Sequence, residues 1–206
     1  METLSASEMN PQQLKNFNQA LDIEAQGIAQ DLFTIPFMFG RLLLADGEQA
    51  LRAIAAIRRL LSEMSHAKFV RFVCMTHPIT GEFIGYAMTF EPGEGDGVGL
   101  HHIWLKPEFR GRGAGSALMR QLIQLHPVMT LVCLPDLIPF YQRFGFITAG
   151  RYTAYKNPGA PESAVIYAGC EMMFRSNRAQ IDGSILLWSD DDLRDIIDAM
   201  GTPPRA

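Results

Sequence analysis

The sequence predicts an α/β fold, in which a mixed and mostly antiparallel sheet has flanking helices and a helical N-terminal extension. Three observations support this fold class. Residues 10–66 repeat apolar side chains at helical spacing, residues 68–105 are rich in β-branched and aromatic side chains, and a glycine-rich turn at 110–115 joins a strand to a helix. The 206 residues suffice for one core with at most one appendage.

The N-terminal part reads as two helices. In the first, apolar side chains recur three or four residues apart, at Leu14, Phe17, Leu21, Ala25 and Ile28. Asn10 before Pro11 is a typical helix start, and the segment LRAIAAIRRLLSEM repeats the helical pattern. The link TIPFMFG contains a proline and a glycine, so we expect it to separate the two helices.

From residue 68 the sequence changes to strand patterns. The segments KFVRFVCMT and EFIGYAMTF flank the turn-like stretch HPITG and predict a hairpin. The loop PGEGDGVG follows, and LHHIWL is the third predicted strand. After the glycine turn we expect a helix in SALMRQLIQLH, a short strand in VMTLVC, a short helix in LIPFYQRF and a strand after GFITAG.

The last two predicted elements are a long strand in AVIYAGCEMMF and a capped helix in SDDDLRDIIDAM. This order predicts one parallel crossover near the glycines. We divide the chain into a helical segment at 1–67, a core at 68–175 and an extension at 176–206.

Composition and charge exclude several classes of protein. Apolar residues make up 48% of the chain and charged residues 19%, which excludes global disorder. A net charge of −4 provides no overall attraction for nucleic acid or an anionic membrane. The three cysteines include no CxxC pair and favour buried thiols in a reducing compartment. The start of the chain lacks signal-peptide features, and the longest apolar stretch, 32–45, is too short and too interrupted to span a bilayer, so we expect a cytoplasmic protein.

The glycine-rich turn is the first candidate site. A strand that ends in glycines at a helix start presents free backbone N–H groups and the positive end of the helix dipole, which together bind anions. Arg110 and Arg112 add positive charge. A Walker A loop is excluded because the turn has no lysine, and the Rossmann pattern is excluded because Ser116 stands where a glycine is required. The alternative is a tight turn with no ligand.

Two motifs give the chain a resemblance to a known family. The turn Arg110-Gly111-Arg112-Gly113-Ala114-Gly115 matches the Arg/Gln-x-x-Gly-x-Gly/Ala motif of the GNAT superfamily of N-acetyltransferases. Downstream, Phe140-Tyr141-Gln142-Arg143-Phe144-Gly145-Phe146 is similar to the aromatic-Tyr and Gly-Phe motif of that family. The resemblance covers residues 68–175. The chain departs from the family where it lacks a recognisable first strand before Lys68, an Asn within 134–139, and a counterpart for the tail beyond Asn177.

The resemblance implies an acyl-CoA donor, which we expect to be acetyl-CoA. It assigns the CoA pyrophosphate to the turn residues Arg110, Gly111, Arg112, Gly113, Ala114 and Gly115. It assigns the pantetheine arm and the thioester carbonyl to the backbone of Ile103, Trp104 and Leu105. It also places Tyr141 near the CoA sulfur as the general acid.

The candidate base is a histidine. His101 and His102 are adjacent on a predicted strand, so we expect them on opposite faces, with His101 on the face of Ile103 and Leu105. By register His101 falls where some relatives carry a glutamate base, and an imidazole is suited to taking a proton from an amine near neutral pH. The alternatives are a histidine that only packs in the core and a reaction without a side-chain base.

Other groups carry weaker hypotheses. Glu91, Glu94 and Asp96 could attract a cationic amine or serve as an alternative base, although a solvated turn is the simpler interpretation. Cys133 could form an acyl-cysteine, but a buried thiol is the simpler interpretation. The remaining histidines, His66, His77 and His126, lack partners at ligand spacing, so no metal is expected.

The resemblance thus implies an N-acetyltransferase that moves acetyl from acetyl-CoA to a primary amine of a small molecule, peptide or protein by direct attack in a ternary complex. The first alternative is a CoA-binding regulatory or partner-docking module with little or no turnover. The second is an unrelated nucleotide-phosphate binder. The aromatic stretch LFTIPFMFGRLLL could border an acceptor pocket or form a homodimer interface, although core packing is the simpler interpretation.

Overall fold

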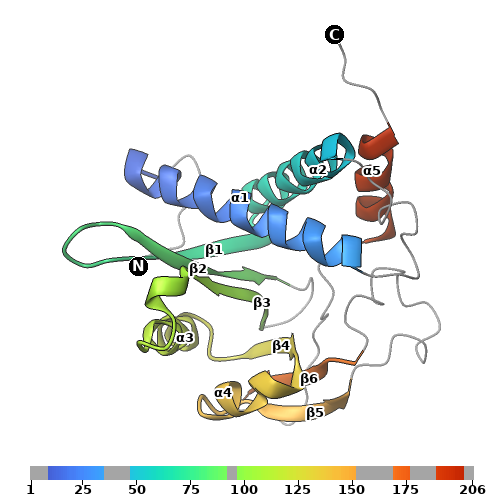
Figure 1. Ribbon diagram of the computed structural model, residues 1–206. Helices are drawn as coiled ribbons and strands as arrows, with labels where there is room; N and C mark the ends of the chain where they lie inside the picture. The colour runs from blue at the N-terminus through green and yellow to red at the C-terminus, as the bar shows by residue number, and fades with distance from the viewer. Residues whose placement is uncertain (1–8, 35–46, 92–96, 152–168, 177–188, 202–206) are drawn as a thin grey trace.

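The computed structural model describes residues 9–34, 47–91, 97–151, 169–176 and 189–201. Most of the aromatic stretch, Glu94, Asp96 and the first part of the predicted last strand lie outside these residues. Within them, the predicted α/β fold class is confirmed (Figure 1).

The described strands form one sheet of six strands in the order β1-β2-β3-β4-β6-β5. An antiparallel meander comes first, made of β1 (Val70–Thr76), β2 (Phe83–Phe90) and β3 (Val98–Leu105). Strand β4 (Met129–Cys133) pairs with β3 in parallel, after a crossover through helix α3 (Ala114–Leu125). Strand β6 (Glu171–Arg175) pairs antiparallel with both β4 and the edge strand β5 (Ile147–Arg151). The predicted single parallel crossover at the glycine turn is therefore confirmed.

The helices cover both faces of the sheet. Helices α1 (Pro11–Thr34), α2 (Gly47–His66) and α5 (Asp190–Gly201) lie on one side of β1, β2 and β3, and α3 lies on the other (Figure 1). Each side has its own apolar core. The α1 side buries Leu21, Ile57, Tyr86 and Ile196, whereas the α3 side buries Leu118, Leu122, Met129 and Met173. The helical segment that precedes the strands is thus part of the core of the protein.

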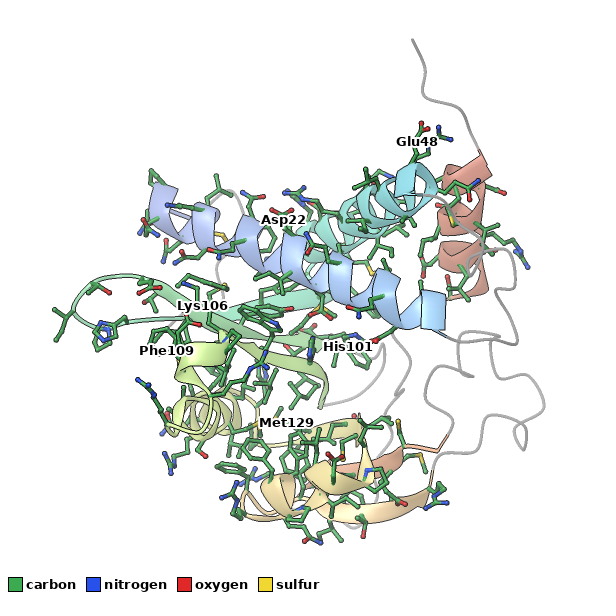
Figure 2. All side chains as sticks on the ribbon, viewed as in Figure 1. Asp22, Glu48, His101, Lys106, Phe109 and Met129 are labelled. Carbon is green, nitrogen blue, oxygen red and sulfur yellow. The ribbon has the colours of Figure 1, made fainter. Side chains whose placement is uncertain are left out.

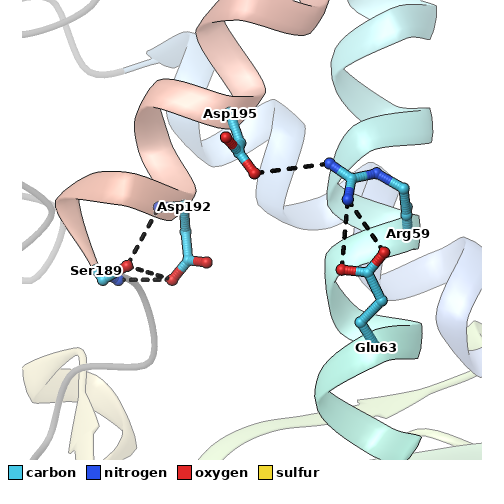
Figure 3. Close-up of polar contacts among 5 residues, drawn as sticks. All are labelled: Arg59, Glu63, Ser189, Asp192 and Asp195. Atoms are coloured by element: carbon cyan, nitrogen blue, oxygen red, sulfur yellow. Dashed lines mark hydrogen bonds and ion pairs between the residues drawn. The ribbon is translucent and has the colours of Figure 1, made fainter.

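Helix α5 is fixed by a cap at its start and by contacts with α2. The Ser189 hydroxyl accepts a hydrogen bond from the Asp192 amide, and the Asp192 carboxylate accepts one from the Ser189 amide (Figure 3). This reciprocal arrangement satisfies backbone donors at the start of the helix. Arg59 of α2 lies 3.7 Å from the carboxylate of Asp195 and also pairs with Glu63 (Figure 3). The predicted capped helix is confirmed.

Candidate active site

The glycine turn has the geometry of an anion-binding site. After β3, the short helix η2 (Pro107–Phe109) leads to Gly111 and Gly113, which have φ values of 70° and 85°. Gly113 is the N-cap residue of α3 and has no side chain that could cap the helix. Among the described residues, no acceptor engages the amides from Gly111 to Ser116. Consecutive unpaired amides at a helix N-terminus fit the oxygens of a phosphate group, so the residues present suit a CoA pyrophosphate.

Arg110 contributes to this turn in a different way from the glycines. Its amide donates to the Pro107 carbonyl at 3.1 Å, and its guanidinium Nε donates to the Leu105 carbonyl at 2.9 Å. The Arg110 amide is therefore already paired and does not join the free set. Its side chain instead fixes the turn to the last residue of β3 and brings a positive charge beside the anion site.

The end of β3 offers a backbone edge next to this turn. The pairing of β3 with β4 stops at Leu100↔Leu131, although β3 continues to Leu105. The backbone of Ile103, Trp104 and Leu105 thus has no partner strand on the β4 side within the described residues. The Trp104 side chain stacks on Tyr86 with ring centroids 6.1 Å apart, so it packs against the α1-side core and away from the donor turn.

Tyr141 is buried in the α3-side core. It lies in the short helix α4 (Ile138–Gln142), which follows the 3-10 helix η3 (Pro135–Leu137). The ring packs on Phe140 and Phe146, with centroids 5.0 and 5.8 Å away. Burial, with a smaller contribution from Cys133, raises the pKa of Tyr141 above its ordinary value of 10.0. The hydroxyl therefore stays protonated at neutral pH, as a general acid requires.

A β-bulge in β3 determines where the two histidines point. Met88 of β2 pairs with His102, and the next residue, Thr89, pairs with Leu100. His101 is therefore an extra residue in β3 that has no partner in β2. The bulge interrupts the alternation of faces, and the prediction that His101 and His102 point to opposite faces is wrong.

Both imidazoles instead contact Glu24 of α1. Nε2 of His101 is 3.4 Å from Oε1 of Glu24, and Nδ1 of His102 is 2.9 Å from Oε2. The hydroxyl of Tyr86 donates to the same Oε2. Figure 2 shows His101 between β3 and the helix α1. His101 therefore does not share a face with Ile103, which packs against the α3-side core.

Glu24 is an ionised carboxylate inside the protein. Only 2% of its surface is exposed. Burial alone would raise the pKa of Glu24, but the hydrogen bonds and charges of His101 and His102 outweigh that effect and lower it below its ordinary value of 4.5. Burial lowers the pKa of His102, whereas Glu24 and then Asp31 raise it, with a net increase above 6.5. Glu24 was not among the predicted site residues, although a glutamate in the apolar face of a helix was a signal in the sequence.

The weaker candidates have ordinary structural roles. Glu91 forms an ion pair with Arg71 at 2.5 Å. Burial raises the pKa of Cys133 to about 11, with smaller contributions from Cys170, Glu171 and Asp136. Its thiol is therefore a poor nucleophile at neutral pH. In the described part of the chain, no three His, Cys, Asp or Glu side chains form a group that could hold a metal ion. None of the described helices is long and apolar enough to cross a membrane.

Comparison with solved structures finds several proteins that this chain is similar to. A solved structure of a histone acetyltransferase HPA2 and related acetyltransferase from Corynebacterium glutamicum superposes with a TM-score of 0.55 at 16% identity, covering 82% of this chain and 94% of the other. An acyl-CoA N-acyltransferase from Pseudomonas aeruginosa has a TM-score of 0.49 at 13% identity. ElaA from Escherichia coli has a TM-score of 0.48 at 18% identity, and both matches cover 84% of this chain and 96% of the other. No curated protein matches the sequence.

A family profile gives the more specific match. The profile of the acetyltransferase (GNAT) family matches residues 39–146, which is more than half of the chain. The match includes β3, the glycine turn, α3 and the Tyr141 helix. The chain therefore belongs to the GNAT family of acetyltransferases, whose co-substrate is acetyl-CoA.

Proposed function

We propose that this acyltransferase is an N-acetyltransferase that transfers acetyl from acetyl-CoA to a primary amine by direct attack in a ternary complex. The observation that carries the proposal is the run of unpaired amides from Gly111 to Ser116 at the N-terminus of α3. These donors suit a pyrophosphate, and the edge of β3 from Ile103 to Leu105 has no partner strand on the β4 side within the described residues, although the Leu105 carbonyl already accepts from Arg110. The remaining backbone groups of this edge are available to the pantetheine arm. The acceptor can be a small amine, a peptide or a protein.

The groups around β3 support direct transfer. An imidazole of β3, for which His101 is the candidate predicted from the sequence, removes one proton from the ammonium form of the acceptor. The neutral nitrogen then forms a bond to the carbonyl carbon while the carbon–sulfur bond breaks. Tyr141 gives its hydroxyl proton to the departing sulfur, and the proton that the nitrogen still has to lose restores the tyrosine through solvent. The products are an amide and CoA thiol.

The donor site is tested by thermal unfolding with acetyl-CoA, CoA, ATP or NAD at matched concentration. A ligand at a hundred times its dissociation constant stabilises the fold by about 2.7 kcal/mol, which is a shift of about 5–10 °C for a chain of this length. We expect this shift with both CoA species and none with ATP or NAD. A shift with ATP or NAD and none with acetyl-CoA would favour the nucleotide-phosphate binder.

Turnover is tested by release of CoA thiol with a panel of amines that includes a polyamine, free amino acids and peptides with a lysine or a free N-terminus. Tyr141→Phe keeps the ring packing and removes only the proton donor. We expect it to bind acetyl-CoA normally and to lose about 10²-fold or more in kcat, because general acid catalysis is of this order. Phe144→Leu, in the same aromatic group, is a control for packing. If donor binding is normal but the wild-type chain turns over no amine, the regulatory module is favoured instead.

A further inference from the structure

Glu24 has an unusual set of partners for a buried carboxylate. It lies on the face of α1 that packs on the sheet. Its partners in the described chain are one tyrosine hydroxyl and two imidazoles. A carboxylate with so little exposed surface needs donors to remain charged. An arginine or lysine would provide permanent charge, but imidazoles are groups that can gain and lose a proton near neutral pH. Glu24 therefore holds two titratable groups in fixed orientations.

The contacts with Glu24 determine which nitrogen of each ring carries hydrogen. An ionised carboxylate only accepts hydrogen bonds, so Nδ1 of His102 must be the protonated nitrogen of the neutral ring. Its Nε2 is then left with a lone pair and can accept a proton. In His101 the nitrogen that faces Glu24 is Nε2, which leaves the lone pair on Nδ1.

The two histidines differ in distance and exposure. The contact of His102 with Glu24 is 2.9 Å, whereas that of His101 is 3.4 Å and longer than a good hydrogen bond. The side chain of His102 is 43% exposed, against 13% for His101. A proton acceptor for a substrate must be both held in place and accessible, and His102 meets these two requirements better.

The topology places His102 on the side of β3 opposite the donor turn. The glycine turn begins α3, which packs on one face of the sheet, and the His102 side chain lies on the other face with α1. Because β3 is unpaired on its β4 side after Leu100, a thioester that follows this edge would lie beside both faces of the strand. An amine that approaches from that face would meet His102.

We infer that Glu24 is a positioning residue that orients His102 as the imidazole that takes the proton from the acceptor amine. This inference rests on the proposed function and deepens it, because it moves the role of base from His101 to its neighbour. The step adds one proton to Nε2 of His102 and leaves the amine nitrogen with a lone pair for attack.

The charges around His102 come from each element packed against it. They are Glu24 and Asp31 of α1, His101 of β3 and the Tyr86 hydroxyl of β2. Glu24 makes the direct contact, and Asp31 acts at longer range in the same direction. Replacement of Glu24 by an amide should therefore change His102 more than any replacement at the other positions.

The first test is nitrogen NMR of the histidine rings in the full chain, which reports the tautomer and titration of each imidazole and needs no turnover. We expect hydrogen on Nδ1 of His102 in the neutral ring and a titration midpoint above 6.5. Glu24→Gln should mix the tautomers and lower that midpoint. Asp22→Asn is the matched control, since Asp22 is a half-exposed carboxylate of the same helix that pairs with Arg58. A neutral His102 protonated on Nε2, or one that Glu24→Gln leaves unchanged, would overturn the inference.

The second test is kinetic and uses the best amine of the panel. His102→Ala should lose about 10²-fold or more in kcat/KM, and added imidazole should restore part of it, because the exposed site can admit a free ring. His101→Ala should retain more activity and show no such rescue. Two results would overturn the assignment. One is a large loss of kcat/KM in His101→Ala while His102→Ala stays near normal, and the other is a His102→Ala variant that imidazole does not rescue. If Glu24→Gln fails to fold, this rescue decides the question of the base.

The two proposals fail in different ways. Absence of acetyl-CoA binding, or binding without turnover, would contradict the proposed function, and the base assignment would fail with it. The effect of Glu24 on the His102 tautomer would still appear in the NMR test. Normal turnover with an unaltered His102 tautomer in Glu24→Gln would instead refute the positioning role alone.

Discussion

At the scale of single residues, two glycines with equally open surroundings differ in backbone conformation. Gly113 begins α3 with a φ of 85°, whereas Gly27 lies within α1 and has no positive φ. A Cβ on either residue would meet nothing within 4 Å. The difference between them is therefore one of backbone conformation and not of space.

We expect Gly113→Ala to lower the free energy of unfolding by about 1–2 kcal/mol, because the left-handed conformation costs an L-residue that much. It should also weaken acetyl-CoA binding, since relief of the strain moves the amides of the turn. Gly27→Ala should instead stabilise the chain by about 0.4–1 kcal/mol and leave binding unchanged. Urea denaturation and titration calorimetry measure both effects. Equal stability of the two variants would contradict the left-handed turn.

A second prediction at this scale concerns Cys133. Its thiol has a pKa raised to about 11, chiefly by burial, and its sulfur lies 3.7 Å from that of Met173. We expect no acetyl adduct by intact mass after incubation with acetyl-CoA alone, and near-normal turnover in Cys133→Ala. An adduct that the substitution abolishes would show a covalent acyl-cysteine and refute direct transfer.

At the scale of elements, the sequence predicts what depends on local pattern. The helices α1 and α2 follow from apolar spacing, and the β1–β2 hairpin follows from two strand patterns around a turn. The bulge at His101 could not be predicted in this way, because an extra residue in β3 exists only relative to its pairing with β2. The prediction for the two histidines failed for this reason.

Glu24 shows a different limit. It lies among Leu21, Ala25 and Ile28 in the buried face of α1, so its position was readable from the helical period. Its partners were not readable, because they come from β2 and β3, more than sixty residues later in the chain. A polar residue in an apolar stripe can be located from sequence, whereas the group that satisfies it requires the tertiary structure.

The start of α5 gives a prediction that belongs to this element. Ser189→Ala removes the hydroxyl that accepts from the Asp192 amide and should cost about 1 kcal/mol of stability. Arg59→Gln removes the ion pairs with Asp195 and Glu63. All three side chains are more than half exposed, so the substitution should cost less than about 1 kcal/mol. Neither variant should change acetyl-CoA binding. Chemical denaturation of both variants checks this order, and a larger cost for Arg59→Gln would contradict it.

At the scale of the whole molecule, the sheet separates two kinds of chemistry. The anion-binding turn begins the helix of one face, and the Glu24 cluster of Tyr86, His101 and His102 lies under the helix of the other. Strand β3 belongs to both, because it ends at the turn and carries the two histidines. Helix α1 is therefore part of both the core and the candidate active site.

Because Glu24 is buried in the core and paired with His102, the stability of the whole fold should depend on pH. The pKa of Glu24 is lower in the folded chain than its ordinary value of 4.5, so its contribution to stability is present above about pH 4.5 and is lost as the pH falls toward the folded value. The pKa of His102 is raised, so its contribution is complete below about pH 6.5 and is lost as the pH rises through the folded value. The cluster therefore stabilises the protein most between about pH 4.5 and 6.5.

The test compares the free energy of unfolding of wild type and Glu24→Gln by urea denaturation from about pH 3.5 to 8.5. The difference between the two free energies should be largest between about pH 4.5 and 6.5 and should decrease on both sides. The reason is that the amide introduced by Glu24→Gln does not titrate in acid and gives His102 no charged partner. Asp22→Asn should differ from wild type by a smaller amount, since Asp22 is half exposed and its ion pair with Arg58 lies at the surface. A difference between wild type and Glu24→Gln that is independent of pH would mean that Glu24 acts through packing alone, without its charge.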